Sequence, residues 1–438
     1  MIRRAFALGC LCAVLLAQDP PDIEKRVENL ERELREERAR GDSREQRIAE
    51  LEGALRKATD ALAQSQDRRG LEEEIEEYLR DHAATVPVAA PSRLNIGAVI
   101  AASYRFSDLE GVQANTFLLD DAYIRLVYRF SENVTARYYT NGTLAEVEYH
   151  HSDLLQLNAG RIVVPFGQFN PRSFVDTFDT LSRPLLYPGD EDGIQAPENS
   201  PSGVFRSTYS DTGVALSGSR WWESHQFNYA LFVTNGLVGT SDLGDSASFR
   251  DNNDNKQLGA RLAYLLVASE RTRLGFGASW MTGKYDAADQ LAHRMYGADV
   301  VLVIDGLFRG GEGSLTIRGE YVYAPREILV PTVGDPTIFL NSENRTEGAY
   351  LLVEARLDPR WMVYVQGDWL AQRSPLLTNG AVDPTDAGLA YSQTWRASIG
   401  VVYKFRLGIV WKLEYSYWDF DLGAPDANVV ATQVVVPF

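Results

Sequence analysis

The sequence predicts an all-β transmembrane barrel of about 16 antiparallel strands, preceded by an N-terminal α-helical coiled coil. Three observations support this prediction. From residue 93 to Phe438 the chain alternates apolar and polar residues in segments of about ten residues, the length of a tilted membrane-spanning strand. The connections alternate between tight turns and long polar loops. The predicted strand ends place tryptophans in two groups, as at the two interfaces of a membrane.

The predicted strands have one apolar and one polar face. In Asn115–Phe130, Leu118 and Ile124 share one face, whereas Asp121 and Arg125 share the other. One face suits lipid and the other suits water. The predicted strands are Arg93–Phe106, Asn115–Phe130, Glu132–Asn141, Thr143–His151, Asp153–Val164, Gly203–Ser219, Ser224–Asn235, Lys256–Ala268, Arg271–Thr282, Arg294–Gly306, Gly313–Ala324, Arg345–Leu357, Arg360–Ala371, Gln393–Phe405, Arg406–Trp418 and Asn428–Phe438.

The connections assign the two rims of the barrel. Tight turns, such as the one predicted at Phe405–Arg406, fall on one rim, and long loops, such as Pro325–Asn344, fall on the other. An even number of strands places both termini on the short-turn rim, predicted to be periplasmic. The longest loop, 165–202, is the third on the long-loop rim. The tryptophans divide likewise: Trp221, Trp222, Trp361 and Trp411 near the short turns, and Trp280, Trp369, Trp395 and Trp418 near the long loops.

The residues before the barrel form three predicted regions. Residues 1–17 have the charged start, apolar stretch and small final residue of a signal peptide. Residues 18–81 carry apolar heptad positions, including Ile23, Val27 and Leu30, which predict a periplasmic coiled-coil stalk; a lone charged helix or a disordered arm is the alternative. Residues 82–92 form a linker with two prolines.

Composition argues against several functions. The net charge of −17 disfavours a nucleic-acid partner. Both cysteines, Cys10 and Cys12, lie in the predicted signal peptide, so the mature chain would have no thiol chemistry. No G-x-S-x-G motif is present, and the adjacent His150 and His151 would face opposite sides of a strand. We therefore expect neither enzyme activity nor a cofactor or metal site.

Several stretches resemble the phosphate-selective porin (porin O/P) family of outer-membrane proteins. They are Gly160-Arg161-Ile162-Val163-Val164-Pro165-Phe166-Gly167, Leu181-Ser182-Arg183-Pro184, Ser210-Asp211-Thr212-Gly213-Val214-Ala215-Leu216-Ser217-Gly218 and Thr234-Asn235-Gly236, with Phe178 and Phe227-Asn228-Tyr229. The resemblance implies a sixteen-stranded homotrimeric barrel in the bacterial outer membrane. It also implies that the third external loop, here 165–202, folds inward to narrow a pore.

In that family basic residues select anions, so the resemblance implies a passive channel for small hydrophilic solutes with an anion preference, phosphate among the candidates. Lumen acids such as Asp121, Glu146 and Glu148 nearly match the bases, and the arginines could instead pair with them and stiffen the wall. The predicted pore-lining and anion-binding residues are Arg93, Arg105, Arg125, Arg129, Arg137, Arg161, Arg172 and Arg183.

Two alternative functions remain open at this point. The barrel could be a general or carboxylate-selective porin. It could also be a structural outer-membrane protein whose stalk tethers the cell wall. The expected partners are small anions or other hydrophilic solutes, outer-membrane lipid, two further copies of the chain in a homotrimer, and peptidoglycan in the tethering alternative.

Overall fold

The computed structural model describes residues 93–108, 115–188, 203–205, 208–237, 253–308, 313–332, 335–375, 389–405, 408–421 and 426–438. All of them belong to the second of two units of the chain, Ala90–Phe438. The predicted signal peptide, coiled-coil stalk and linker lie outside the described residues and stay predictions. In the part of the chain that the structure describes, no helix is long and apolar enough to cross a membrane.

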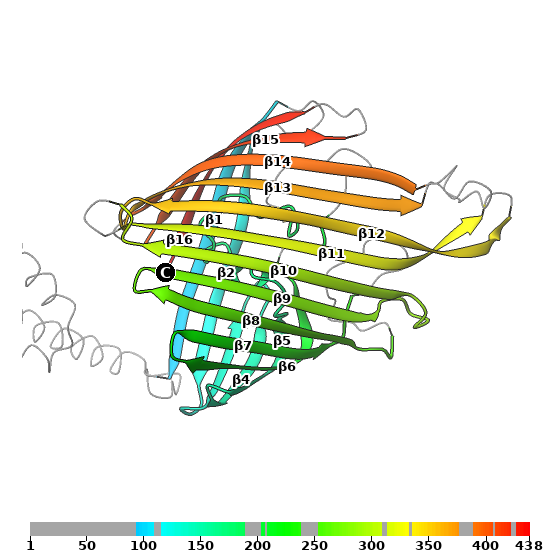
Figure 1. The fold of residues 1–438 in the computed structure, drawn as a ribbon, viewed down its shortest axis with the longest axis horizontal. Helices are drawn as coiled ribbons and strands as arrows, with labels where there is room; N and C mark the ends of the chain where they lie inside the picture. Colours follow the sequence, from blue (N-terminus) through cyan, green and yellow to red (C-terminus); the bar gives the residue numbers. More distant parts are fainter. Residues whose placement is uncertain are drawn as a thin grey trace, which may run out of the picture. The chain divides into compact units, whose positions relative to one another are not determined.

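Sixteen strands of the described residues form one closed antiparallel barrel, which confirms the predicted fold (Figure 1). Each strand pairs with its neighbours in sequence, and β1 pairs with β16 to close the ring. The strands are β1 Leu94–Ser107, β2 Thr116–Arg129, β3 Val134–Tyr139, β4 Ala145–Ser152, β5 Leu155–Val163, β6 Ser210–Trp222, β7 His225–Thr234, β8 Gln257–Ser269, β9 Thr272–Lys284, β10 Ala292–Asp305, β11 Ser314–Thr332, β12 Asp335–Arg356, β13 Trp361–Pro375, β14 Leu389–Lys404, β15 Val410–Phe420 and β16 Ala427–Pro437; a short 3-10 helix, η1, spans Asn170–Arg172.

The closing seam accommodates a proline near the end of the chain. The Phe438 N–H donates to the Ala98 carbonyl at 2.8 Å, and the Ala98 N–H donates to the Phe438 carbonyl at 3.3 Å. Because successive residues of a strand point their N–H groups to opposite sides, the nitrogen of Pro437 faces β15. The described β15–β16 ladder ends at the Val410–Val435 pair, so Pro437 is not required to donate a ladder hydrogen bond there.

The outer surface of the barrel is apolar all the way round. Every one of the sixteen described strands carries at least one large hydrophobic side chain that is exposed. A water-soluble protein rarely exposes apolar patches of more than a few hundred Å², whereas a lipid-embedded barrel requires such a belt. Representatives in strand order are Ile96, Ile124, Tyr138, Val147, Leu157, Val214, Phe227, Leu262, Phe276, Tyr296, Tyr321, Leu351, Val365, Ile399, Tyr415 and Val430.

The prediction of a loop at Pro325–Asn344 is wrong, because most of these residues belong to two strands. β11 continues to Thr332 and β12 begins at Asp335, and their ladder runs without a break from Ser314 to Pro331. Pro325 and Pro331 both lie within β11, because proline is excluded from a strand only where its nitrogen must donate to a ladder. Figure 1 shows the resulting hairpin extending beyond the neighbouring strands.

A β-bulge in β2 reverses which side chains face lipid in the first part of this strand, so the predicted faces are wrong there. The pairing of β1 with β2 shifts between Ala101 and Ala102, which inserts one extra residue, Asp120, into β2. Beyond the bulge, Leu118 pairs with Ser103, whose side chain is buried inside the barrel, so Leu118 does not lie on the lipid face as predicted. The neighbouring Phe117 and Leu119 are exposed in its place.

Three further predictions need correction. β6 begins at Ser210 rather than Gly203. The turn predicted at Phe405–Arg406 is longer: β14 ends at Lys404 and β15 begins at Val410, because Gly408, with φ of 80°, shapes a wider turn. Trp418 does not belong to an outer aromatic girdle. It is buried, and its ring lies 4.9 Å from the Arg396 guanidinium.

Candidate functional site inside the barrel

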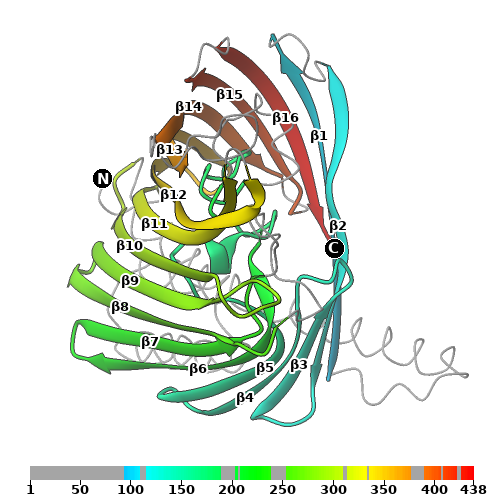
Figure 2. The same cartoon turned by 90° about the vertical axis from the view of Figure 1, so that its right-hand side faces the viewer.

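Residues 164–188, between β5 and β6, pass through the interior of the barrel. We name them the inner segment. They contact inward-facing side chains of β2, β9 and β11 to β15. Figure 2 shows this blue-green stretch of chain inside the ring of strands. The remainder of the predicted loop, 189–202, lies outside the described residues.

A buried carboxylate on β11 holds both ends of the inner segment. Glu320 accepts hydrogen bonds from the backbone N–H groups of Gln168 (3.2 Å) and Phe169 (3.1 Å). It also accepts one from the Tyr187 hydroxyl, at 2.5 Å. Burial, and then the negative charge of Glu320, raise the pKa of Tyr187, which therefore stays a neutral donor. Glu320 thus joins residues that are about 20 positions apart in the inner segment.

Carboxylates on two further strands bind the second half of the inner segment. Asp368 on β13 accepts a hydrogen bond from the Leu185 N–H at 3.2 Å. Glu414 on β15 accepts hydrogen bonds from the Ser182 N–H at 3.2 Å and from the Ser182 hydroxyl at 2.5 Å. These acids satisfy backbone groups that would otherwise be buried without partners.

Cations from the wall bind backbone carbonyls of the same half. The Lys412 ammonium donates to the carbonyls of Val175 (3.4 Å), Phe178 (3.1 Å) and Thr180 (2.9 Å). Arg396, on β14, donates to the Arg183 carbonyl and also pairs with Asp368 at 3.0 Å. The inner segment is therefore held by fixed groups of both charges.

Two aspartates of the inner segment link walls that are not adjacent in the barrel. Asp176 pairs with Arg125 on β2 and accepts a hydrogen bond from the Tyr123 hydroxyl at 2.8 Å. Three residues later, Asp179 pairs with Lys404 on β14 at 2.9 Å and with Arg356 on β12 at 3.4 Å. The inner segment therefore crosses the interior instead of following one wall.

Aromatic side chains fill the space around the inner segment. Phe169 lies 5.2 Å from Tyr187 between ring centroids, and Tyr187 stacks on Phe205 at 5.2 Å. Phe166 also packs against Phe205, at 5.4 Å. All four rings are buried. The rings thus fill this part of the interior in the manner of a protein core.

The eight predicted arginines do not form one array. Arg93 and Arg129 are exposed at the short-turn rim. Arg125 pairs with Asp176, and Arg137 pairs with Glu146 (2.9 Å) and Glu148 (2.6 Å). The others are placed as follows: Arg105 is buried 3.6 Å from Asp120, Arg161 lies within electrostatic reach of Asp211, Arg183 lies over the Phe178 ring at 5.3 Å, and Arg172 lies in η1 of the inner segment.

Arg172 differs from the paired arginines. Its side chain is half-buried, and among the described residues it makes no hydrogen bond or ion pair. The pKa of Arg172 lies below its ordinary value. Burial, and then the nearby positive charge of Arg318, lower it by more than Glu354, Tyr350 and Asp179 raise it. Arg318 pairs with Glu354 at 2.9 Å through its Nε. Two guanidinium groups therefore lie near each other, and the carboxylates close to Arg172, those of Glu354 and Asp179, are paired with other cations.

Several interior cations lie at the site but were not among the predicted site residues. Arg261 pairs with Asp299 at 2.5 Å, and Arg356, Arg396 and Lys412 contact the inner segment. The sequence alternation could have identified these four cations as inward-facing. Each lies next to an exposed apolar residue, as Arg396 lies next to Trp395. In the described residues, no group of three or more His, Cys, Asp or Glu side chains is arranged to hold a metal ion.

No protein-family model matches the chain, and no curated protein matches its sequence. Solved structures that it resembles include the anion-selective porin from Comamonas acidovorans (10% identity, TM-score 0.46, 79% of this chain and 99% of that one). Others are the outer membrane channel DcaP of Acinetobacter baumannii (14%, 0.44, 80% and 99%) and the trimer form of OmpT from Vibrio cholerae (11%, 0.44, 79% and 99%). At these values, the assignment of the fold rests on the strand pairing of this chain itself.

Proposed function

We propose that the protein is an outer-membrane porin, a passive diffusion channel for small hydrophilic solutes. The observation that carries this proposal is a closed barrel whose outer face is apolar and whose inner face carries charged side chains around an inner segment. Such a barrel is suited to lipid outside and water inside. The inner segment would narrow the channel, and the short-turn rim would face the periplasm.

We further propose an anion preference that depends on Arg172. The paired cations of the wall contribute little net positive charge, because each lies beside an acid. Arg172 has no ion pair among the described residues, and the acids near it, Glu354 and Asp179, are paired with other cations, so an anion passing the inner segment meets a local excess of positive charge. A guanidinium can bind phosphate or carboxylate oxygens in two hydrogen bonds, so inorganic phosphate is one candidate solute.

The test is the ion selectivity of the purified protein in planar bilayers, measured as the reversal potential in a KCl gradient. We expect Arg172→Ala to reduce the chloride-to-potassium permeability ratio, and Arg172→Lys to preserve most of it. Arg93→Ala, on the rim, serves as the control and should leave the ratio close to that of the wild type. An unchanged ratio in Arg172→Ala would refute the role given to Arg172.

A general or carboxylate-selective porin is the second candidate. The pairing of Arg137 with Glu146 and Glu148, and of Arg261 with Asp299, favours it, because neutralised walls discriminate weakly between ions. Phosphate block distinguishes the candidates: a phosphate-preferring channel shows a saturable reduction of chloride current as phosphate is added. A general porin shows none.

The assembly and the stalk belong to the same proposal. We propose a homotrimer, with residues 18–81 as a periplasmic stalk. Deletion of residues 22–80 would separate the roles of the stalk. Loss of conductance would assign it to assembly, and normal conductance with a weakened cell envelope would favour a tether to peptidoglycan.

A further inference from the structure

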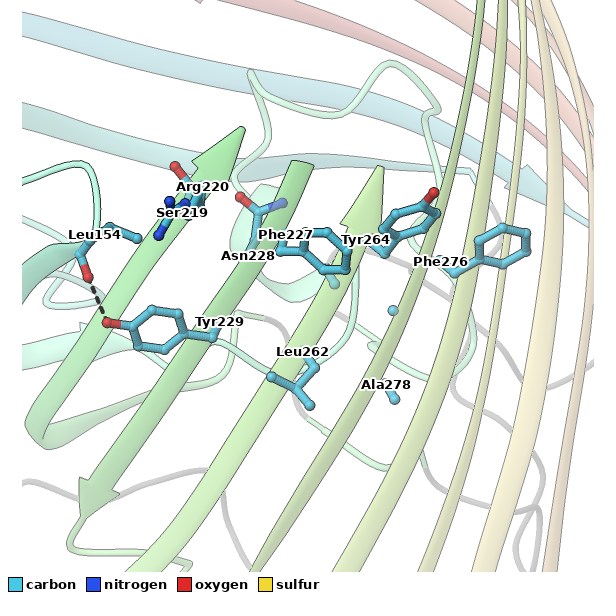
Figure 3. Close-up of a pocket in the computed structure, with 12 residues that line it drawn as sticks. Leu154, Ser219, Arg220, Phe227, Asn228, Tyr229, Leu262, Tyr264, Phe276 and Ala278 are labelled. Carbon is cyan, nitrogen blue, oxygen red and sulfur yellow. Dashed lines mark hydrogen bonds between the residues drawn. The ribbon is translucent and has the colours of Figure 1, made fainter. Parts of the chain in front are cut away.

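An apolar groove lies on the outer face of β6 to β9, near the short-turn rim (Figure 3). Its volume is about 500 Å³. The register explains its shape. Phe227, Tyr264 and Phe276 form one cross-strand row of aromatic rings, and Leu262 stands beside the small Ala278 in the next row. The groove therefore has bulky apolar sides and a low floor.

The row that contains Leu262 and Ala278 continues through Tyr229 on β7 to Gly218 on β6. Gly218 pairs with Tyr229, whose ring lies over the glycine. The Tyr229 hydroxyl donates to the Leu154 carbonyl at 2.6 Å, the contact drawn as a dashed line in Figure 3. This hydrogen bond fixes the ring at one edge of the groove and satisfies a polar group on a lipid-facing surface.

A cation stands at the end of this apolar groove. Arg220 pairs across the ladder with Phe227, is exposed, and lines the groove. Among the described residues its side chain has neither an ion pair nor a hydrogen bond. The exposed Trp222 lies two residues further toward the rim, where indole rings favour the membrane interface. The groove thus combines a surface for acyl chains with an unneutralised positive charge at headgroup depth.

A second groove on the outer face provides a comparison within the same barrel. It lies on β12 to β15, has a volume of about 510 Å³, and is lined by residues that include Leu351, Trp369 and Trp395. Arg373 lies on the same outer face, four residues beyond Trp369 in β13, and it pairs with Glu347 at 3.8 Å. The two grooves are similar in size and apolar lining, but only the first has an exposed arginine in its lining without an acidic partner among the described residues.

We infer that the groove on β6 to β9 is a binding site for a glycerophospholipid, with its acyl chains against Phe227, Leu262 and Phe276 and its phosphate at Arg220. Charge complementarity selects this occupant. A second copy of the chain would have to bury Arg220 against its own acid, whereas a lipid phosphate supplies the anion and the chains together. The inference rests on the proposed membrane location and does not depend on whether the barrel conducts.

The test is native mass spectrometry of the purified protein in detergent, titrated separately with phosphatidylglycerol and with a diacylglycerol of the same acyl chains. We expect the wild type to bind phosphatidylglycerol about tenfold more tightly, as one charge-assisted contact predicts. Arg220→Gln should remove this preference. Ala278→Leu, which fills the groove from an exposed position, should weaken binding of both lipids.

Two matched variants of the second groove, Arg373→Gln and Gly367→Leu, should leave the preference unchanged. The inference is overturned if Arg220→Gln keeps the tenfold preference, or if Ala278→Leu binds both lipids as the wild type does. A change of oligomeric state in Ala278→Leu without a change in lipid binding would also overturn it, and would assign the groove to a contact between copies. Conductance recorded on the same variants separates this result from a failure of the proposed channel function.

Discussion

Gly167 shows how tightly the inner segment is held at the scale of single residues. Its φ is 66°, and a Cβ placed on it would lie 1.9 Å from the Glu320 carboxylate and 2.6 Å from the Tyr187 hydroxyl. Gly367, on the outer face of β13, would place a Cβ in open space. The two glycines therefore form a natural pair for substitution.

We expect Gly167→Ala to lower the free energy of unfolding by about 1–3 kcal/mol, because both the backbone conformation and the carboxylate contact are disturbed. Gly367→Ala should be neutral or stabilise by about 0.5 kcal/mol through the unfolded chain. Urea unfolding of both variants in lipid vesicles measures the difference. Equal effects at the two sites would contradict the close packing described for Gly167.

Asp179 gives the inner segment a defined response to acid. Burial raises the pKa of its carboxyl, but the charges of Lys404, Lys412 and Arg356 outweigh burial and leave the pKa below its ordinary value. Its pKa is then lower in the folded than in the unfolded protein, where it is about 3.9. The resulting stabilisation is present above about pH 4 and is lost as the pH falls through the folded-state pKa.

The prediction is that wild type exceeds Asp179→Asn in stability at pH 7 and that this difference shrinks by pH 3. Urea unfolding at the two pH values measures it, and comparison with the variant cancels the titration of other acids. A difference that is the same at both pH values would show that the carboxylate charge does not stabilise the inner segment.

At the scale of elements, the attachment of the inner segment to β11 depends on Glu320. Glu320→Ala would leave the buried N–H groups of Gln168 and Phe169 and the Tyr187 hydroxyl without their acceptor. We expect a loss of about 3 kcal/mol or more in the free energy of unfolding, since each unsatisfied buried group costs about 1–3 kcal/mol.

Tyr187→Phe removes only one of these contacts and should cost about 1–2 kcal/mol. Glu343→Ala is the control, because Glu343 pairs with the exposed Arg345 on β12 and should change stability by about 0.5 kcal/mol or less. Urea unfolding midpoints rank the three variants. A Glu320→Ala variant as stable as Glu343→Ala would mean that the inner segment is held by its aromatic packing instead.

The strands could be predicted because their information is local. Alternation along Leu94–Ser107 identifies the lipid face without knowledge of any neighbour, and the same holds for the other strands. The bulge at Asp120 could not be predicted, because it depends on how β2 pairs with β1. The long β11–β12 hairpin was missed for a related reason. Whether Pro325 breaks a strand depends on which way its nitrogen points in the ladder.

At the scale of the whole molecule, the course of the inner segment depends on contacts between residues far apart in sequence. Phe169 and Glu320 are 151 positions apart, and Ser182 and Glu414 are 232 apart. Strand parity indicates that Glu320 and Glu414 face inward, but parity does not identify their partners. The same limit applies to the arginines. Arg125 was expected in the lumen, whereas its pairing with Asp176 becomes visible only in the closed barrel.

Single-channel recording of Arg172→Cys tests the central claim, that the interior is a permeation path narrowed by the inner segment. The only native cysteines, Cys10 and Cys12, lie in the predicted signal peptide, so the introduced thiol would be the sole target of a bulky thiol reagent. We predict discrete conductance steps in the wild type and in the unmodified variant, and a marked reduction of the steps after the variant has reacted. Absence of steps in the wild type, or steps that stay unchanged after complete reaction, would contradict the account.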